Sequence, residues 1–190
     1  MTGSIELLGP RNNEPTTIDD HIKCSEPFRL IGERRFEYDL DDKATKAKLV
    51  KGSKRAPFLV EENSTSSNLI FSTGSWFNIV LPSVRYWEEI QGDETCQVGD
   101  SIIKIGGIKT GKDSRGRRVD SQIVFFVDGH KVTCHFNNTT QKILVNGNGY
   151  RKLIDIFLKP FFIAKIDSCL GEIQSYNEFL LDKLGHKTVR

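Results

Sequence analysis

The sequence lacks the short motifs that mark most catalytic and cofactor sites. It contains no P-loop, no GxGxxG after a predicted strand, no HExxH and no GxSxG. Its cysteines are widely separated and form no CxxC pair, which predicts free thiols rather than a disulfide framework: Cys24, Cys96, Cys134 and Cys169. These absences make an enzyme the less favoured interpretation, and we expect neither a cofactor nor a bound metal.

The sequence also has no long apolar run and no strong excess of charge of one sign. A membrane span needs about 18 apolar residues in a row, and none is present. Residues 1–6 have neither the basic segment nor the apolar core of a secretory signal, so we expect an intracellular protein without a membrane partner. Because 27 Lys and Arg stand against 25 Asp and Glu, only the distribution of charge can indicate a partner.

Methionine is nearly absent, whereas phenylalanine is plentiful. One Met against 12 Phe, in a chain that is 37% hydrophobic, predicts a core of rigid aromatic side chains. The length of 190 residues fits one domain with an extended arm. Residues 1–27 contain Pro10, Pro15 and Pro27 among polar residues and are predicted to form a flexible N-terminal arm, which leaves residues 28–190 as a single domain.

Strand-like patterns fill the second half of the chain. Residues 123–127 are β-branched or aromatic on both alternating faces, which predicts a central strand buried on both sides. Asp128-Gly129 suits a tight hairpin because both residues tolerate a positive φ. Residues 131–136 then alternate between polar and apolar, and residues 142–145 predict a further short strand. Together these strands predict an antiparallel meander.

A helical apolar spacing follows the meander. Residues 150–161 carry an apolar stripe that can cover a sheet face, and Pro160 predicts a kink or break near Lys159. Residues 170–184 predict an amphipathic helix that stops at Gly185. We therefore predict an α+β fold: an antiparallel β-meander sheet of about four to six strands, covered on one face by C-terminal helices. The predicted core contains Phe125, Val132, Cys134, Phe136, Leu153, Ile154, Phe157 and Phe161.

The first half of the domain predicts shorter elements. The patterns indicate a half-buried strand at 36–40, a short helix at 43–50 ended by Gly52, and short strands at 58–60 and 68–71. Residues 76–90 have helical spacing, with Ser75 as a cap and Pro82 as an interruption; a strand followed by a turn at Pro82 is the alternative. An acidic loop is predicted at 92–99, before the sheet resumes at 102–108.

Two basic segments stand out against the balanced net charge. The first has no acidic residue and lies on and after the predicted short helix: Lys43, Lys46, Lys48, Lys51, Lys54 and Arg55. The second has one acidic residue and two glycines at a predicted exposed hairpin tip: Lys109, Lys112, Arg115, Arg117 and Arg118. Arginine suits bidentate contacts to phosphate, and Gly111 and Gly116 would let the backbone approach a duplex closely. Contact with a nucleic-acid backbone is one interpretation, and an ordinary solvated helix and hairpin is the other.

One stretch is similar to known sequences. It runs from His130-Lys131-Val132-Thr133-Cys134-His135-Phe136 through Gly149-Tyr150 to Phe157-Leu158-Lys159-Pro160-Phe161-Phe162. This stretch, residues 130–163, resembles a segment of large, poorly characterised proteins encoded by mobile elements in invertebrate genomes. In those proteins it precedes a Cys/His zinc-finger-like sequence that this chain lacks. The resemblance carries no catalytic motif; it implies nucleic-acid binding and a domain taken from a longer protein.

These observations favour a nucleic-acid-binding module, with DNA preferred over RNA and the nucleus as its location. The first alternative is a protein-interaction or assembly module. In that case the apolar stripe of the C-terminal helix would pair with a partner helix or a second copy of the chain, through Leu170, Ile173, Tyr176 and Leu180.

The second alternative is a metal-dependent, nuclease-like enzyme. Only the pairs Asp100 with Lys104 and Asp128 with Lys131 suggest it, and such sites need two or more converging carboxylates. A zinc site is disfavoured as well, because His135 lies on the opposite face of its predicted strand from Cys134.

Overall fold

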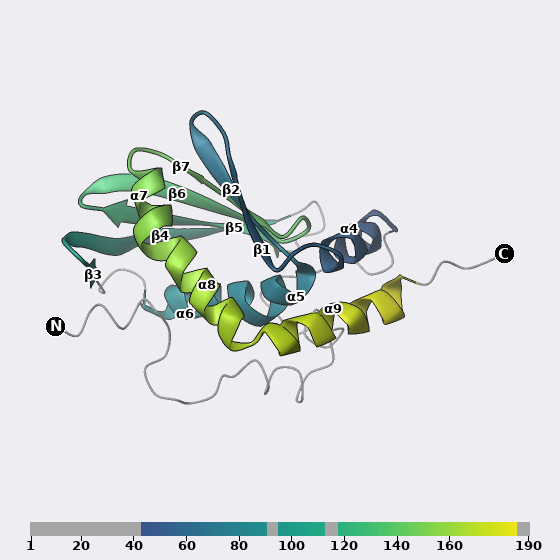
Figure 1. The fold of residues 1–190 in the computed structure, drawn as a ribbon. Helices are drawn as coiled ribbons and strands as arrows, with labels where there is room; N and C mark the ends of the chain where they lie inside the picture. Colours follow the sequence, from purple (N-terminus) through teal and green to yellow (C-terminus); the bar gives the residue numbers. More distant parts are fainter. Residues whose placement is uncertain (1–42, 91–94, 113–117, 186–190) are drawn as a thin grey trace.

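Residues 43–90, 95–112 and 118–185 are described by the computed structural model, in which one antiparallel sheet has helices packed on one face (Figure 1). In chain order the elements are α4 (Lys43–Ser53), β1 (Phe58–Glu62), β2 (Ser66–Phe71), α5 (Thr73–Ser75), the π-helical turn η1 (Trp76–Val80), α6 (Leu81–Ile90), β3 (Thr95–Val98), β4 (Ser101–Lys112), β5 (Arg118–Val127), β6 (His130–Asn137), β7 (Lys142–Asn146), α7 (Tyr150–Leu153), the π-helical turn η2 (Ile154–Leu158), α8 (Lys159–Ser168) and α9 (Leu170–Leu184). The predicted arm at 1–27 and the predicted strand at 36–40 lie outside the described residues.

The strand order across the seven-stranded sheet is β1-β2-β7-β6-β5-β4-β3, with every neighbouring pair antiparallel. Strands β4 to β7 form the predicted meander, β3 extends its β4 edge, and the β1–β2 hairpin extends its β7 edge. The α+β prediction is therefore confirmed, although the sheet is larger than expected. Part of the difference is β3, which occupies a stretch predicted as a loop. Its Cys96 is buried while Thr95 and Gln97 are exposed, the alternation of a half-buried edge strand.

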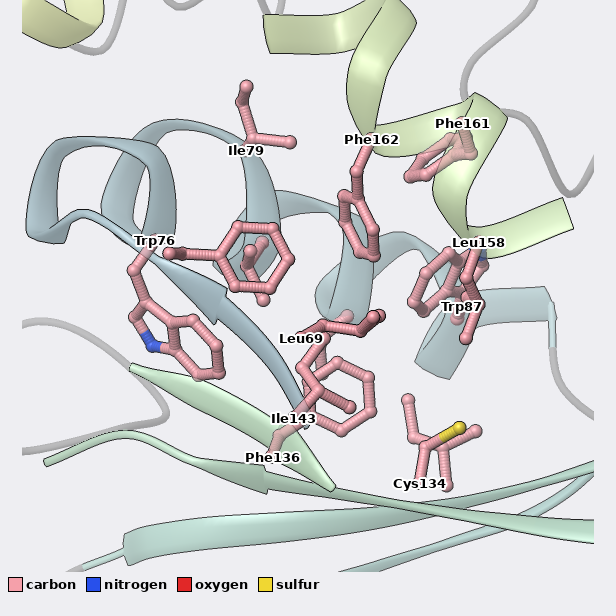
Figure 2. Packing of buried hydrophobic residues seen from close by; sticks show 14 of the residues in the cluster. Leu69, Trp76, Ile79, Trp87, Cys134, Phe136, Ile143, Leu158, Phe161 and Phe162 are labelled. Carbon is pink, nitrogen blue, oxygen red and sulfur yellow. The ribbon is translucent and has the colours of Figure 1, made fainter. Parts of the chain in front are cut away.

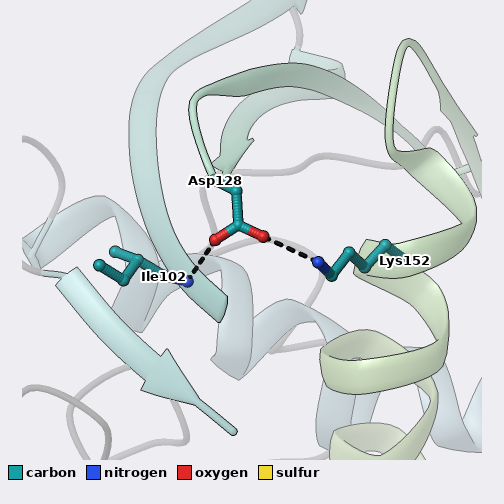
Figure 3. Close-up of polar contacts among 3 residues, drawn as sticks. All are labelled: Ile102, Asp128 and Lys152. Carbon is teal, nitrogen blue, oxygen red and sulfur yellow. Dashed lines mark hydrogen bonds and ion pairs between the residues drawn. The ribbon is translucent and has the colours of Figure 1, made fainter. Parts of the chain in front are cut away.

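The hairpin between β5 and β6 has the predicted turn. Asp128 and Gly129 both have positive φ, 51° and 85°, which matches the twist of the flanking strands. The Asp128 carboxylate accepts hydrogen bonds from the Ile102 backbone N–H and from Lys152 Nζ, each at 2.9 Å (Figure 3). These bonds, first of all the one from Ile102, lower the pKa of Asp128 to about 2. The turn thereby joins β4 and α7 at one end of the sheet.

Aromatic side chains fill the layer between the sheet and the helices (Figure 2). Trp87 of α6 is fully buried, and its ring centroid lies 5.6 Å from that of Phe125 on β5 in an edge-to-face arrangement. Trp87 also contacts Phe157 of η2 at 6.1 Å and Phe161 of α8 at 5.5 Å. All the residues predicted for the core are buried, so the prediction of an aromatic core under the C-terminal helices is confirmed.

Two prolines lie inside helices without ending them. Pro82 of α6 follows the wide turn η1, and Pro160 of α8 follows the wide turn η2. A proline has no N–H for the preceding turn, and its ring collides with that turn's carbonyl in a regular α-helix; a π-turn relieves the collision. The break expected near Lys159 and the interruption expected at Pro82 are therefore wrong, whereas a kink near Lys159, the other expected outcome, stays a prediction. The helical stretch that contains Pro82 begins at Thr73, and its N-terminal cap is Ser72 rather than Ser75.

The central strand β5 is not buried on both faces, contrary to the prediction. Phe125 and its neighbours on the core face are buried, whereas Val124 and Phe126 on the other face are half-buried. The Phe126 ring lies over Gly106 of β4, where an added Cβ would collide with it. On this outer face the apolar side chains of β5 therefore pack over a glycine of the neighbouring strand, and not against a second layer of described elements. In the part of the chain that the structure describes, the helices pack on the opposite face (Figure 1).

A buried polar junction joins three helices. Asn177 of α9 accepts a hydrogen bond from the Gly74 backbone N–H at 2.6 Å and donates one to Ser72 Oγ at 3.1 Å. Thr73 Oγ1 donates to the Leu49 carbonyl of α4 at 2.8 Å. Buried polar groups must be hydrogen-bonded to avoid a large desolvation cost. This junction therefore fixes how α4 and α9 sit against α5.

Candidate nucleic-acid interface

Helix α4 presents the first basic segment to solvent. Its Lys and Ala residues are strong helix formers, and the predicted helix is confirmed. Leu49, Gly52 and Ser53 are buried against the domain. The four lysines of α4 lie away from that face, with Lys43, Lys48 and Lys51 exposed and Lys46 half-buried, and the exposed Lys54 directly follows the helix. Among the described residues, no carboxylate forms an ion pair with any of these lysines.

Arg55 has a different position from the lysines before it. Its Nη1 donates hydrogen bonds to the Phe71 carbonyl at 3.1 Å and to the Thr140 carbonyl at 2.7 Å. Burial lowers the pKa of the guanidinium from its ordinary value. The guanidinium therefore ties the residues after α4 to the ends of β2 and of the β6–β7 turn, which gives it a structural role that the sequence did not indicate.

This tie places α4 at the end of the sheet where β4 stops and β5 begins. Thr140, bound by Arg55, lies in the turn that follows Asn137 of β6. Asn137 pairs with Asp120 of β5, and Asp120 pairs with Gly111 of β4. The two basic segments, far apart in sequence, thus converge on one end of the sheet. Helix α7 lies at the opposite end (Figure 1).

The hairpin contributes the second basic segment at this end. Lys109 is exposed, Lys112 ends β4 and Arg118 begins β5, so the predicted hairpin between the two strands is confirmed. Arg115 and Arg117 lie outside the described residues, so their part in the interface stays a prediction. The structure also shows why residue 111 is glycine: an added Cβ there would collide with the Asp120 carboxylate across the strand pair.

A small depression lies on the outer face of the sheet beside this hairpin. It has a volume of about 240 Å³, and the described residues that line it include Lys109, Gln122 and His135, which form one row across β4, β5 and β6. Asp120 and Asn137 line it from the next row. The depression offers hydrogen-bond donors and acceptors beside a cation, which suits contacts to sugars or base edges. The Asp120 carboxylate disfavours a phosphate inside it.

Sequence reasoning missed three residues of this surface. Gln122 and His135 face the depression, and Lys142 begins β7 next to Asn137. The signal was present, because alternation along β5 and β6 puts Gln122 and His135 on the face opposite the apolar core. What the sequence alone could not supply is the strand register that sets these side chains beside Lys109.

The candidate metal ligands do not come together. His135 and Cys134 lie on opposite faces of β6, and Cys134 is fully buried in the core, where desolvation raises the pKa of its thiol. Within residues 43–90, 95–112 and 118–185, no group of three or more His, Cys, Asp and Glu side chains could hold a metal ion. Cys96, Cys134 and Cys169 are buried and form no disulfide.

The apolar stripe of the C-terminal helix α9 is used within the chain. Ile173, Tyr176 and Leu180 are buried, and α9 packs against α4 and α5. Leu170 remains partly exposed, at 39%. The stripe that motivated the assembly alternative therefore does not offer a free surface for a partner helix.

Comparison with protein-family models, curated proteins and solved structures finds no match to this chain. None of the described helices is both long enough and apolar enough to cross a membrane. The fold and the site thus define the chain as an α+β protein with an antiparallel sheet and a basic surface at one end of it.

Proposed function

We propose that this chain binds nucleic acid, DNA in preference to RNA, through the end of the sheet that carries α4 and the β4–β5 hairpin. The observation that supports the proposal is the convergence of two basic segments at that end, joined by the Arg55 hydrogen bond to Thr140. The other end of the sheet differs, because its Lys152 and Arg151 are paired with Asp128 and Glu62. The lysines of the first segment form no ion pair with a carboxylate among the described residues, and such a group of cations attracts a polyanion.

The binding energy comes mainly from phosphate contacts. Lys48 and Lys51 of α4 and Lys54, which directly follows the helix, are exposed and can reach phosphates. Each neutralised phosphate of duplex DNA releases condensed counterions, so affinity falls with salt with a slope of about 0.9 per contact. Arg55 is not one of these contacts, because its guanidinium already binds two main-chain carbonyls.

The preference for DNA and the nuclear location rest on the resemblance of residues 130–163 to mobile-element proteins. The depression beside Lys109 supports a role beyond charge attraction, because Gln122 and His135 can exchange hydrogen bonds with sugars or base edges there. A module of this kind acts by binding and requires no catalytic residue.

The experiment is a fluorescence anisotropy titration of labelled duplex DNA, single-stranded DNA and RNA of one sequence at several salt concentrations. The variant replaces Arg115, Arg117 and Arg118 by Ala. Its matched control carries Lys104→Ala, Lys131→Ala and Lys159→Ala, which removes the same charge from exposed positions away from the basic end.

The hairpin variant should lose affinity for every sequence, and its salt slope should fall by about 0.9 for each lost phosphate contact. Its melting temperature should stay close to that of the parent, because the sequence predicts an exposed hairpin tip for these arginines and substitutions at exposed positions change stability by about 0.5 kcal/mol or less. The control should bind DNA nearly as tightly as the parent. Equal losses in the two triple variants would show that only overall charge matters, and a parent that binds no nucleic acid at low salt would end the proposal.

A further inference from the structure

A groove lies away from the basic end, between the end of β3 and the covering helical segments η2 and α8. Its volume is about 620 Å³, within the range of about 300–1,000 Å³ typical of ligand pockets. Its β3 side ends at Val98 and Gly99, next to Ser101, whose neighbour Ile102 is bonded to Asp128. The groove therefore belongs to the end of the sheet opposite α4.

The lining of this groove is mainly apolar. It is formed by aliphatic and aromatic side chains and a proline ring: Val98, Ile156, Phe157, Pro160, Phe161 and Ala164. Two polar residues of the lining already have partners within the chain. Ser168 Oγ donates to the Lys165 carbonyl at 2.8 Å, and Gln97 Nε2 donates to the Gly99 carbonyl at 3.3 Å.

Lys165 is the one charged residue among the described residues that line the groove. Its Nζ lies 5.5 Å from the centroid of the Phe161 ring, which also lines the groove, so the ammonium group sits beside the apolar surface. Burial lowers the pKa of Lys165 from its ordinary value. Among the described residues no carboxylate forms an ion pair with Lys165, and a partly desolvated ammonium binds an anionic group more strongly than an exposed lysine does.

We propose that this groove binds a free amphipathic carboxylate, a molecule of the fatty-acid class with one carboxylate and an unbranched apolar chain. The chain would lie against Phe157, Pro160 and Ala164, and the carboxylate would pair with Lys165 Nζ. Complementarity favours this occupant: the described lining is mainly apolar, its polar Gln97 and Ser168 already have partners within the chain, and Lys165 is its one charged residue, so the matching ligand is apolar except for one anion. This site is independent of the nucleic-acid surface at the other end of the sheet.

The test uses isothermal titration with dodecanoate, decanoate and dodecanol, each below its micelle concentration, on the full chain. The parent should bind dodecanoate about tenfold more tightly than decanoate, because two further methylenes are buried. Lys165→Met should weaken dodecanoate binding at least about tenfold and leave dodecanol binding unchanged. The matched control Lys159→Met, an exposed lysine of the same helix, should bind all three probes like the parent.

A second variant tests the apolar part of the site. Ala164→Trp fills the groove and should weaken dodecanoate and dodecanol alike, with the melting temperature as a check on folding. The proposal is overturned if the parent binds no dodecanoate, or if Lys165→Met binds it as tightly as the parent. It is also overturned if Lys165-dependent binding is seen only with vesicles containing anionic phospholipid, because a membrane surface would then be the ligand. DNA binding should be the same in the parent and in Lys165→Met, which separates this test from that of the proposed function.

Discussion

Arg55 illustrates how one residue of a charged run can have a different role from its neighbours. In the sequence it ends a series of cations, yet its guanidinium bonds the Phe71 and Thr140 carbonyls and holds α4 to the sheet. We predict that Arg55→Ala lowers the free energy of unfolding by about 1–3 kcal/mol, because two carbonyls lose their donor. Urea denaturation measures this change.

The control for Arg55 is Lys54→Ala, an exposed neighbour that should change stability by about 0.5 kcal/mol or less. Comparing the two variants separates the structural role of Arg55 from the phosphate contact proposed for Lys54. A loss of stability in Lys54→Ala equal to that in Arg55→Ala would contradict the structural role given to Arg55.

A second prediction at the residue scale concerns Asp128 and the stability of the fold at acidic pH. Its pKa is about 2 in the folded chain, chiefly because of the Ile102 N–H, against about 3.9 in an unfolded chain. Because the folded pKa is the lower one, Asp128 stabilises the fold above about pH 4, and this contribution is lost as the pH falls through about 2. Asp128→Asn should therefore flatten the dependence of the melting temperature on pH between about 4 and 2.

Lys152→Met provides a graded comparison for Asp128. It removes the ion pair at 2.9 Å but keeps the bond from Ile102, so it should flatten the same part of the pH profile by a smaller amount. Identical pH profiles for the parent and Asp128→Asn would show that the turn carboxylate does not contribute to acid stability.

At the scale of elements, one buried amide contributes to the docking of α9 beside its buried apolar side chains. Asn177 satisfies the buried Gly74 N–H and binds Ser72 Oγ, so Asn177→Ala leaves a buried donor without its partner. We predict a destabilisation of about 1–3 kcal/mol, measured by urea denaturation. Glu178→Ala, an exposed neighbour on the same helix, is the matched control and should be nearly neutral. Equal stability of Asn177→Ala and the parent would mean that apolar packing alone docks α9.

An element could be predicted from the sequence where local interactions form it, and not where long-range contacts do. The meander, its Asp128-Gly129 turn and the helices after residue 150 arise from local periodicity and turn chemistry, and they were predicted correctly. The prolines were misjudged because the π-turns that accommodate them depend on packing against the sheet. Strand β3 was missed because its pairing with β4, rather than its own composition, makes it a strand.

At the scale of the whole molecule, the two basic segments could be identified from the sequence, but their position at the same end of the sheet could not. Their convergence depends on long-range contacts, from Arg55 to Thr140 and from Asp120 to Asn137. Neither contact has a local signature, and the row Lys109, Gln122 and His135 likewise needs the strand register. The apolar stripe of α9 shows the reverse case, because a pattern typical of a partner helix is satisfied within the same chain.

The central claim is that α4 and the hairpin act as one surface, and the salt dependence of duplex DNA binding by Lys48→Ala, Lys51→Ala and Lys54→Ala tests it most directly. Two of these substitutions lie on α4 and Lys54→Ala directly follows it; all three positions are exposed and remote in sequence from the hairpin. The account predicts weaker binding and a salt slope lowered by up to about 2.7, from about 0.9 for each lost contact, with the melting temperature unchanged. The claim would be contradicted if this triple lysine variant bound duplex DNA with the affinity and salt slope of the parent while the triple arginine variant of the hairpin bound it more weakly.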